Sequence, residues 1–283
     1  MPLGQMTQAA IPPTVPGHVQ WLVNTGRRVT TSCGRDVEIW ELRHGSDEDV
    51  LSAWAAHFRR HYCLEEHIDN LRAGTNLSRA NYLAQIKFPD AATSPGPSIR
   101  SGDFAEILVA DYLEFVLNYW VPRTRYSDKT SRNESTKGSD VMGFKLTRAD
   151  RSSPTDTMFI IESKAKLAGF AARGRLQDAI KDSAKDPRRK AESLNAIKQR
   201  LVAQGKAVEA QRIGRFQNPV DHPYAERYGA AAVLATSLLD LDDIALATTT
   251  AHPHADALML IVIHGDSLMQ LVHALYDRAA SEA

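Results

Sequence analysis

Three short apolar runs limit the fold of this chain more than any other feature of its sequence. They cover residues 158–161, 231–238 and 257–265. Each run is apolar at consecutive positions, which is typical of a buried strand covered on both faces, and none is long enough to cross a lipid bilayer. A long polar helical stretch at about 174–204 separates the first run from the second. The pattern predicts a mixed sheet with helices on both faces, in the α/β class.

Shorter patterns complete the predicted order of elements. Alternating and β-branched residues predict strands at 36–45, 140–146 and 157–167, with a further short strand at 123–127. Apolar spacing and capping residues predict helices from Ser46 onward, at 64–72, at 78–86, at 101–120 with Pro122 as its stop, and after a cap at Asp266. The turn between the strands at 140–146 and 157–167 predicts an antiparallel hairpin, to which the later strands add in parallel.

One stretch suggests a division of the chain. Residues 87–100 are rich in Pro, Gly and Ser, as linkers are. We therefore expect a flexible leader at 1–20, an N-terminal α/β region at 21–95 and a C-terminal domain at 96–283. The acidic balance outside the central segment suits an N-terminal region that docks on a partner or shields a basic surface.

The charge of the chain is balanced overall and uneven locally. Lys+Arg and Asp+Glu both number 34, yet residues 121–215 hold 22 basic and 11 acidic side chains, and the flanks are correspondingly acidic. Such an excess favours a local site for a polyanion such as DNA. A solvated basic helix explains the same count equally well, so charge alone leaves both interpretations open.

The cysteines and the N-terminal residues indicate in which cellular compartment the protein is found. Cys33 and Cys63 lie in unrelated contexts, which excludes a disulfide framework or a cysteine zinc site and fits a reducing compartment. The first residues lack the basic start and apolar core of a signal peptide. We therefore expect a cytoplasmic protein that does not enter a membrane.

The strand at 157–167 ends in charge. Because side chains alternate along a strand, Glu162 and Lys164 face the same way, about 7 Å apart, and Ser163 faces the other way. A carboxylate there can hold a divalent metal, and an ammonium beside it can stabilise developing negative charge or help a metal-bound water lose its proton. The alternative is a structural ion pair at a strand end.

Two further acids are candidates to complete a metal site. Asp140 begins the preceding strand, so a hairpin would bring it next to Glu162. Glu106 lies on an apolar stripe of the helix at 101–120, where an ionised carboxylate needs a partner. Magnesium prefers oxygen ligands and usually takes one or two carboxylates.

These residues resemble the PD-(D/E)xK nuclease superfamily over about 101–238. The features that carry the resemblance are Asp140, then after 21 residues Glu162-Ser163-Lys164 at the end of an apolar strand, all behind a helix that carries Glu106. The resemblance implies an αβββαβ restriction-endonuclease-like core and hydrolysis of phosphodiester bonds with Mg²⁺ or Mn²⁺. Ser139 stands where the superfamily usually has proline.

The resemblance also implies a role for each residue. Asp140 and Glu162 would be metal ligands, Lys164 the catalytic lysine, and Glu106 an additional catalytic acid and metal ligand. Gln177 would be the extra polar residue that some members place on the next helix.

More narrowly, the order of these motifs is similar to HamA, the nuclease subunit of Hachiman anti-phage systems. That resemblance implies a DNase without strong sequence specificity that acts with a helicase subunit, HamB. Two alternatives stay open: a non-catalytic nucleic-acid-binding or assembly subunit on a nuclease fold, and a nuclease of DNA repair or restriction.

A DNase needs cations that grip phosphates without reading bases. The candidates in the basic segment are Arg123, Arg125, Arg132, Lys166, Arg173, Arg175, Arg188 and Arg189.

Two rival chemistries are disfavoured. Ser163 and Lys166 match a Ser-x-x-Lys pattern, but that chemistry needs a helix start, and strand alternation puts the two on opposite faces. His222, His252 and His254 invite a zinc site, but their spacing is not that of a helix or hairpin, and the prolines beside them favour loops.

Overall fold

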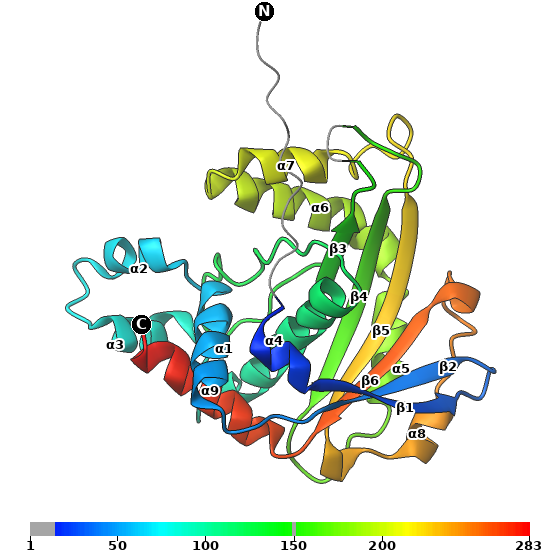
Figure 1. Cartoon of the computed structure of the whole chain (residues 1–283), viewed down its shortest axis with the longest axis horizontal. Coiled ribbons are helices and arrows are strands. Elements are labelled where there is room, and N and C mark those ends of the chain that lie inside the picture. Colours follow the sequence, from blue (N-terminus) through cyan, green and yellow to red (C-terminus); the bar gives the residue numbers. More distant parts are fainter. Residues whose placement is uncertain (1–14, 149–150) are drawn as a thin grey trace, which may run out of the picture.

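A computed structural model describes residues 15–148 and 151–283 of the chain. Within them a six-stranded sheet has the order β1-β2-β6-β5-β4-β3 and carries helices on both faces (Figure 1). β2, β6, β5 and β4 pair in parallel, and β1 and β3 add antiparallel edges. The predicted mixed α/β fold is confirmed.

The elements follow one another in this order. The strands are β1 (Leu22–Thr30), β2 (Asp36–Leu42), β3 (Val141–Lys145), β4 (Thr157–Lys166), β5 (Ala225–Ala235) and β6 (Met259–Gly265). The α-helices are α1 (Glu48–Arg60), α2 (Glu65–Arg72), α3 (Arg79–Tyr82), α4 (Gly96–Asp111), α5 (Arg175–Ser183), α6 (Asp186–Ala203), α7 (Ala207–Gly214), α8 (Leu241–Ala245) and α9 (Leu268–Ser281). Short 3₁₀ or π-helical turns are η1 (Gly17–Trp21), η2 (Leu83–Lys87), η3 (Tyr112–Val116), η4 (Thr236–Leu238) and η5 (Ala255–Ala257).

The sheet separates two hydrophobic cores. Phe159 and Ile161 of β4 pack into the core shared with α1, α4 and α9, whereas Met158 and Ile160 pack into the core under α5, α6 and α7. All four side chains are buried. β4 is therefore apolar at consecutive positions because both of its faces are covered.

The N-terminal region joins the same sheet as the rest of the chain. β2 pairs in parallel with β6, and Val37 lies opposite Leu260. The predicted division into 21–95 and 96–283 stays a prediction. Of the predicted leader, residues 1–14 lie outside the described residues, and η1 occupies most of the remainder.

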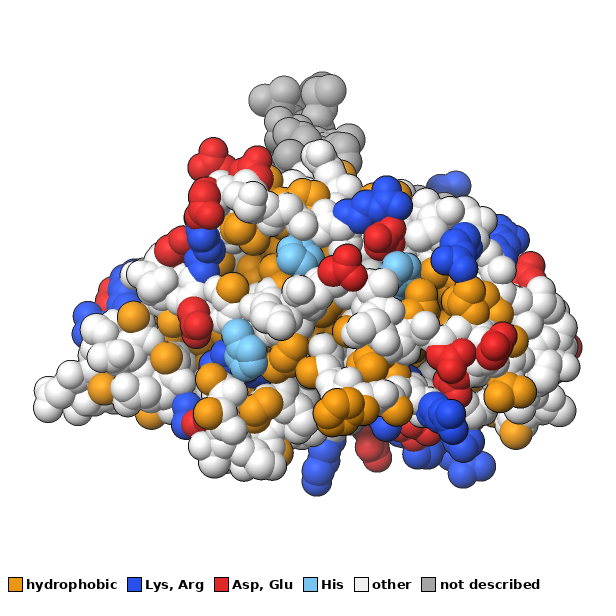
Figure 2. All heavy atoms as spheres, turned by 90° about the horizontal axis from the view of Figure 1, so that it is seen from below, with side chains coloured by type: hydrophobic (Ala, Val, Ile, Leu, Met, Phe, Trp, Pro, Cys, Tyr) orange, Lys and Arg blue, Asp and Glu red, His pale blue; other side chains and the backbone are white. Residues whose placement is uncertain are grey.

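The surface fits a chain of zero net charge. On the face that Figure 2 shows, acidic and basic side chains are interspersed around apolar patches. Among the described residues, no helix combines the length and the apolar character that a membrane span requires.

Two predictions near the site were wrong. The helix predicted at 101–120 starts earlier, at Gly96, and its last turn η3 ends at Val116, because Asn118 adopts a left-handed backbone with φ 59°. Pro122 therefore does not stop it. The strand predicted at 123–127 is a loop: Arg123 has φ 50°, which no extended strand adopts.

Two other predictions need correction, and two elements were not predicted. The single helix predicted at about 174–204 is two helices, α5 and α6, because Pro187 lacks the N–H that would continue the first and suits the first turn of the second. β1 and α7 were not predicted. The N-cap of α9 is Ser267 rather than Asp266.

Gly143 sets how closely the chain after α4 approaches β3. A Cβ at this position would lie 2.6 Å from Leu113 Cδ2 and 2.9 Å from Tyr119 Cβ, both buried. The absence of a side chain therefore lets η3 and Tyr119 pack directly on the strand that follows Asp140.

We expect Gly143→Ala to lower the free energy of unfolding by about 1–3 kcal/mol, because the added methyl overpacks a filled core. Gly102→Ala is the matched control: it lies in α4 with nothing within 4 Å of its Cβ position, so it should gain about 0.5–1 kcal/mol from helix propensity. Urea denaturation measures both. Equal stability of the two variants would contradict the close approach.

Candidate active site

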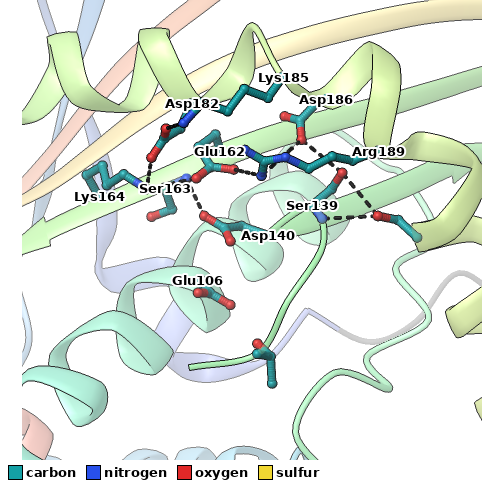
Figure 3. A network of polar contacts seen from close by, with 12 residues as sticks. Glu106, Ser139, Asp140, Glu162, Ser163, Lys164, Asp182, Lys185, Asp186 and Arg189 are labelled. Atoms are coloured by element: carbon teal, nitrogen blue, oxygen red, sulfur yellow. Dashed lines mark hydrogen bonds and ion pairs between the residues drawn. The ribbon is translucent and has the colours of Figure 1, made fainter. Parts of the chain in front are cut away.

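The β3–β4 hairpin places Asp140 opposite Glu162. The register pairs Val141 with Ile161. Asp140 directly precedes Val141 and Glu162 directly follows Ile161, so these two acids lie opposite each other. Asp140 Oδ2 accepts a hydrogen bond from the backbone N–H of Ser163 at 3.0 Å. The carboxylate thus replaces the backbone partner that β4 loses where β3 begins, and this fixes its position next to Glu162 (Figure 3).

Lys164 is held by two carboxylates. Its Nζ lies 2.8 Å from Glu162 Oε1 and 2.8 Å from Asp182 Oδ2 of α5. Burial alone would lower the pKa of Lys164, but these carboxylates raise it above its usual value. The lysine is therefore an ammonium ion at neutral pH. The ion pair at the strand end is real, and α5 extends it into a network.

Glu162 has one oxygen without a hydrogen-bond partner. The residue is 3% exposed, and Oε2 is buried with no hydrogen-bond donor; Arg189 Nη1 lies 4.0 Å from it. Burial, and next the charge of Asp140, raise the pKa of Glu162 to about 8. The ionised form of Glu162 is therefore disfavoured, and a bound cation would stabilise it.

Glu106 approaches the same place from α4, on the other side of Asp140 (Figure 3). Its Oε2 accepts a hydrogen bond from the Tyr126 hydroxyl at 2.5 Å and lies 2.7 Å from Arg125 Nε. Burial raises the pKa of Glu106 to about 8, against the opposing effect of Arg125. The partner that this carboxylate was expected to need is present.

Asp186 is a fourth acid of the site, and the sequence did not single it out. It is fully buried at the start of α6, where Oδ1 accepts a hydrogen bond from Ser139 Oγ at 2.9 Å and Oδ2 has no partner. Burial raises its pKa to about 6, and the charge of Asp140 adds to that rise. An acid directly before Pro187 was the available signal, since the pair marks a helix start.

These acids fit a divalent cation in their chemistry. Carboxylate oxygens are the ligands that Mg²⁺ prefers, and Glu162 Oε2 has no hydrogen-bond partner. Burial raises the pKa of Glu162 and of Glu106 to about 8, so a bound cation would favour their ionised forms. Glu106, Asp140 and Glu162 are nevertheless spread wider than a compact ligand set. In the described part of the chain, the one group of three such side chains with all ligand atoms within 4.8 Å is His18, His57 and Asp111.

That group is a buried polar network around Asp111. Asp111 accepts from His18 Nε2 at 3.0 Å and His57 Nε2 at 2.9 Å, and Arg123 lies 2.7 Å away. Arg123 also pairs with Glu114 at 2.6 Å. The carboxylate is already neutralised by a guanidinium, so the network ties η1, α1 and the loop after η3 to the end of α4.

Most of the arginines predicted to bind nucleic acid have partners within the protein. Arg123 belongs to the Asp111 network, Arg125 joins Glu106 to Asp140, and Arg132 pairs with Asp90. Arg175 lies 3.5 Å from Asp178. The loop at 121–132 thus uses its arginines to hold the fold together.

The other residues predicted to bind nucleic acid differ in whether they have partners within the protein. Lys166, Arg173 and Arg188 take part in no ion pair among the described residues, and Arg173 and Arg188 are exposed. Gln177 both donates to and accepts from the backbone of Thr248, at 3.2 and 2.8 Å. Its amide therefore fastens α5 to the segment after α8.

The rival sites find no support in the structure. Ser163 and Lys166 belong to strand β4, not to a helix start, so the Ser-x-x-Lys chemistry lacks its geometry. His254 stacks on Tyr228 with ring centroids 4.5 Å apart, and His222 bonds to Ser152. No group of metal-ligand side chains found among the described residues includes them.

The chain matches a known protein family. The family model described as HamA matches residues 17–279, which is nearly the whole chain. No curated protein matches the chain.

We expect the two buried histidines to stabilise the fold less as pH drops below the ordinary histidine value of 6.5. Burial lowers the pKa of His18 and of His61, so these two side chains bind more protons in the unfolded chain than in the folded one in this range. Their contribution to stability is then full above pH 6.5 and declines below it, by up to about 1.4 kcal/mol per pH unit for each histidine, whereas Glu106 and Glu162, with pKa values raised to about 8, act in the opposite direction. Thermal unfolding across pH measures the slope.

The matched pair of variants is His61→Gln and His67→Gln. His61 is buried and His67 is exposed on α2, so only the first should change the slope, in the direction of higher stability at low pH relative to the wild type. A slope that neither variant changes would assign the acid sensitivity to other groups.

Proposed function

The chain belongs to the HamA family, and we propose that it is a metal-dependent deoxyribonuclease that acts as an effector in Hachiman anti-phage defence. Family membership supports the role in defence. The proposed phosphodiester chemistry and its Mg²⁺ or Mn²⁺ ion rest on the acidic site and on the resemblance to PD-(D/E)xK nucleases, and the proposed helicase partner rests on the resemblance to HamA.

One observation supports the proposal most strongly. Asp140 and Glu162 lie opposite each other, Glu162 Oε2 is buried without a donor, and the Lys164 ammonium lies on the same face of β4. A purely structural ion pair would satisfy its carboxylate, because a buried unpaired oxygen costs free energy. An oxygen left unpaired beside a second acid suits a site that binds a cation.

Each residue then has a defined task. Asp140 and Glu162 would hold the ion, with Glu106 as a further ligand from α4, and the ion would supply Lewis-acid stabilisation and a more acidic bound water. Asp182 orients Lys164. Because the carboxylates keep Lys164 protonated, it would stabilise the negative charge that develops on the phosphate and would not act as a general base.

DNA would be held mainly by charge. Lys166, Arg173 and Arg188 are the predicted cations without internal partners among the described residues, and Lys166 continues the face of β4 that carries Glu162. Contacts of this kind recognise phosphates and carry no sequence information. A chain of zero net charge binds the DNA backbone weakly on its own, which favours action with a helicase subunit.

A second candidate function is a non-catalytic binding or assembly subunit on the same fold. The internal pairing of Arg123, Arg125 and Arg132 argues against a dedicated DNA-binding surface at that loop. Asp140, Glu162 and Lys164 are all present and converge, which favours the enzyme.

We expect Glu162→Gln and Lys164→Ala to abolish Mg²⁺-dependent DNA cleavage while the protein stays folded. Loss of one charge-stabilising group lowers such rates by about 10²–10³-fold or more. Lys145→Ala is the matched control, since it removes an exposed lysine from the end of β3. Cleavage of labelled DNA with purified protein, alone and with the helicase subunit, gives the rates.

The outcomes separate the two candidate functions. Normal cleavage by both site variants would place the active site elsewhere. Failure of the wild-type protein to cleave with any divalent ion, with or without its partner, would support the binding subunit.

A further inference from the structure

Arg125 lies where a cation between Glu106 and Asp140 would lie. Its Nε is 2.7 Å from Glu106 Oε2, and its Nη2 is 2.8 Å from Asp140 Oδ1. The same guanidinium donates to the backbone carbonyls of Thr136 and Ser139. One side chain thus contacts both of the acids that come from opposite sides of the site.

The surroundings of Arg125 make it a permanent positive charge. Guanidinium groups stay protonated in proteins, and the side chain is only 14% exposed. Among the described residues, no other cation lies within 4 Å of either Glu106 or Asp140. The two carboxylates therefore depend on Arg125 for neutralisation.

A divalent ion needs the same oxygens. Asp140 Oδ2 already accepts from the Ser163 N–H, and Oδ1 is the oxygen that Arg125 occupies. An ion bound at Oδ1 would be only a few ångströms from the guanidinium, where like charges repel strongly. Arg125 and the ion therefore compete for one position. This also explains why the acids are spread wider than a compact ligand set.

We propose that Arg125 is a built-in counter-ion that holds Glu106 and Asp140 in place of the metal and must leave when the ion binds. The proposal rests on the proposed metal-dependent function. It makes Arg125 a positioning residue in the metal-free protein. The pocket beside it is also lined by Lys137 and Arg200, so a DNA phosphate there would take over as partner of the released guanidinium.

The test measures metal binding directly and does not depend on cleavage. Mn²⁺ is titrated into the wild-type chain, Arg125→Gln and Arg132→Gln, and free Mn²⁺ is followed by electron paramagnetic resonance. Arg125→Gln removes the competing charge, so it should bind Mn²⁺ about tenfold more tightly or better. Arg132→Gln is the matched control from the same loop, because its partner is Asp90, and it should bind like the wild type.

A second measurement keeps the proposal testable if Arg125→Gln folds poorly. Without metal, this variant should melt at a lower temperature than the wild type, and Mn²⁺ should raise its melting temperature by more. Arg125→Lys keeps the charge but loses the fork that spans both acids, so its affinity for Mn²⁺ should lie between the two.

The possible failures differ. Unchanged or weaker Mn²⁺ binding by Arg125→Gln, with binding by the wild type intact, would overturn the role of Arg125 and leave the metal site standing. Absence of Mn²⁺ binding in every variant and in the wild type would overturn the metal site itself.

Discussion

The hydrogen bond from the Ser163 N–H to Asp140 is the contact on which the site depends. It forms because β3 begins only at Val141, opposite Ile161, while β4 continues to Lys166, which leaves this edge of β4 unpaired where its charged residues begin. An acid at that point satisfies the strand edge and brings a negative charge to face Glu162. The acids of α4 and α6 then gather around a carboxylate that the backbone holds rigidly.

Much of this could be predicted, because it is local. Alternation along β4 fixes the common face of Glu162 and Lys164, and the hairpin fixes Asp140. Arg125 and Asp186 could not be assigned correctly, since their roles depend on where helices and loops end. The loop that carries Arg125 was predicted as a strand, and the helix start at Asp186 was predicted as the interior of a helix.

The remaining misses concern contacts between distant parts of the chain. His18 and Asp111 are neighbours only because η1 packs on the end of α4. No local sequence pattern predicts this packing. β1 was not predicted because its exposed edge carries polar residues instead of an apolar run. The cores were easier to infer, because central strands that are buried on both faces are apolar at consecutive positions of the sequence.

The parallel pairing of β2 with β6 has a consequence for how the protein is made. β2 is synthesised long before β6, its parallel neighbour in the sheet. Until then, the hydrophobic faces of β2 and α1 lack the partners that β6 and α9 provide, and closing so long a loop is slow. The hairpin that carries the acids therefore belongs to a complete sheet only after β6 has been synthesised.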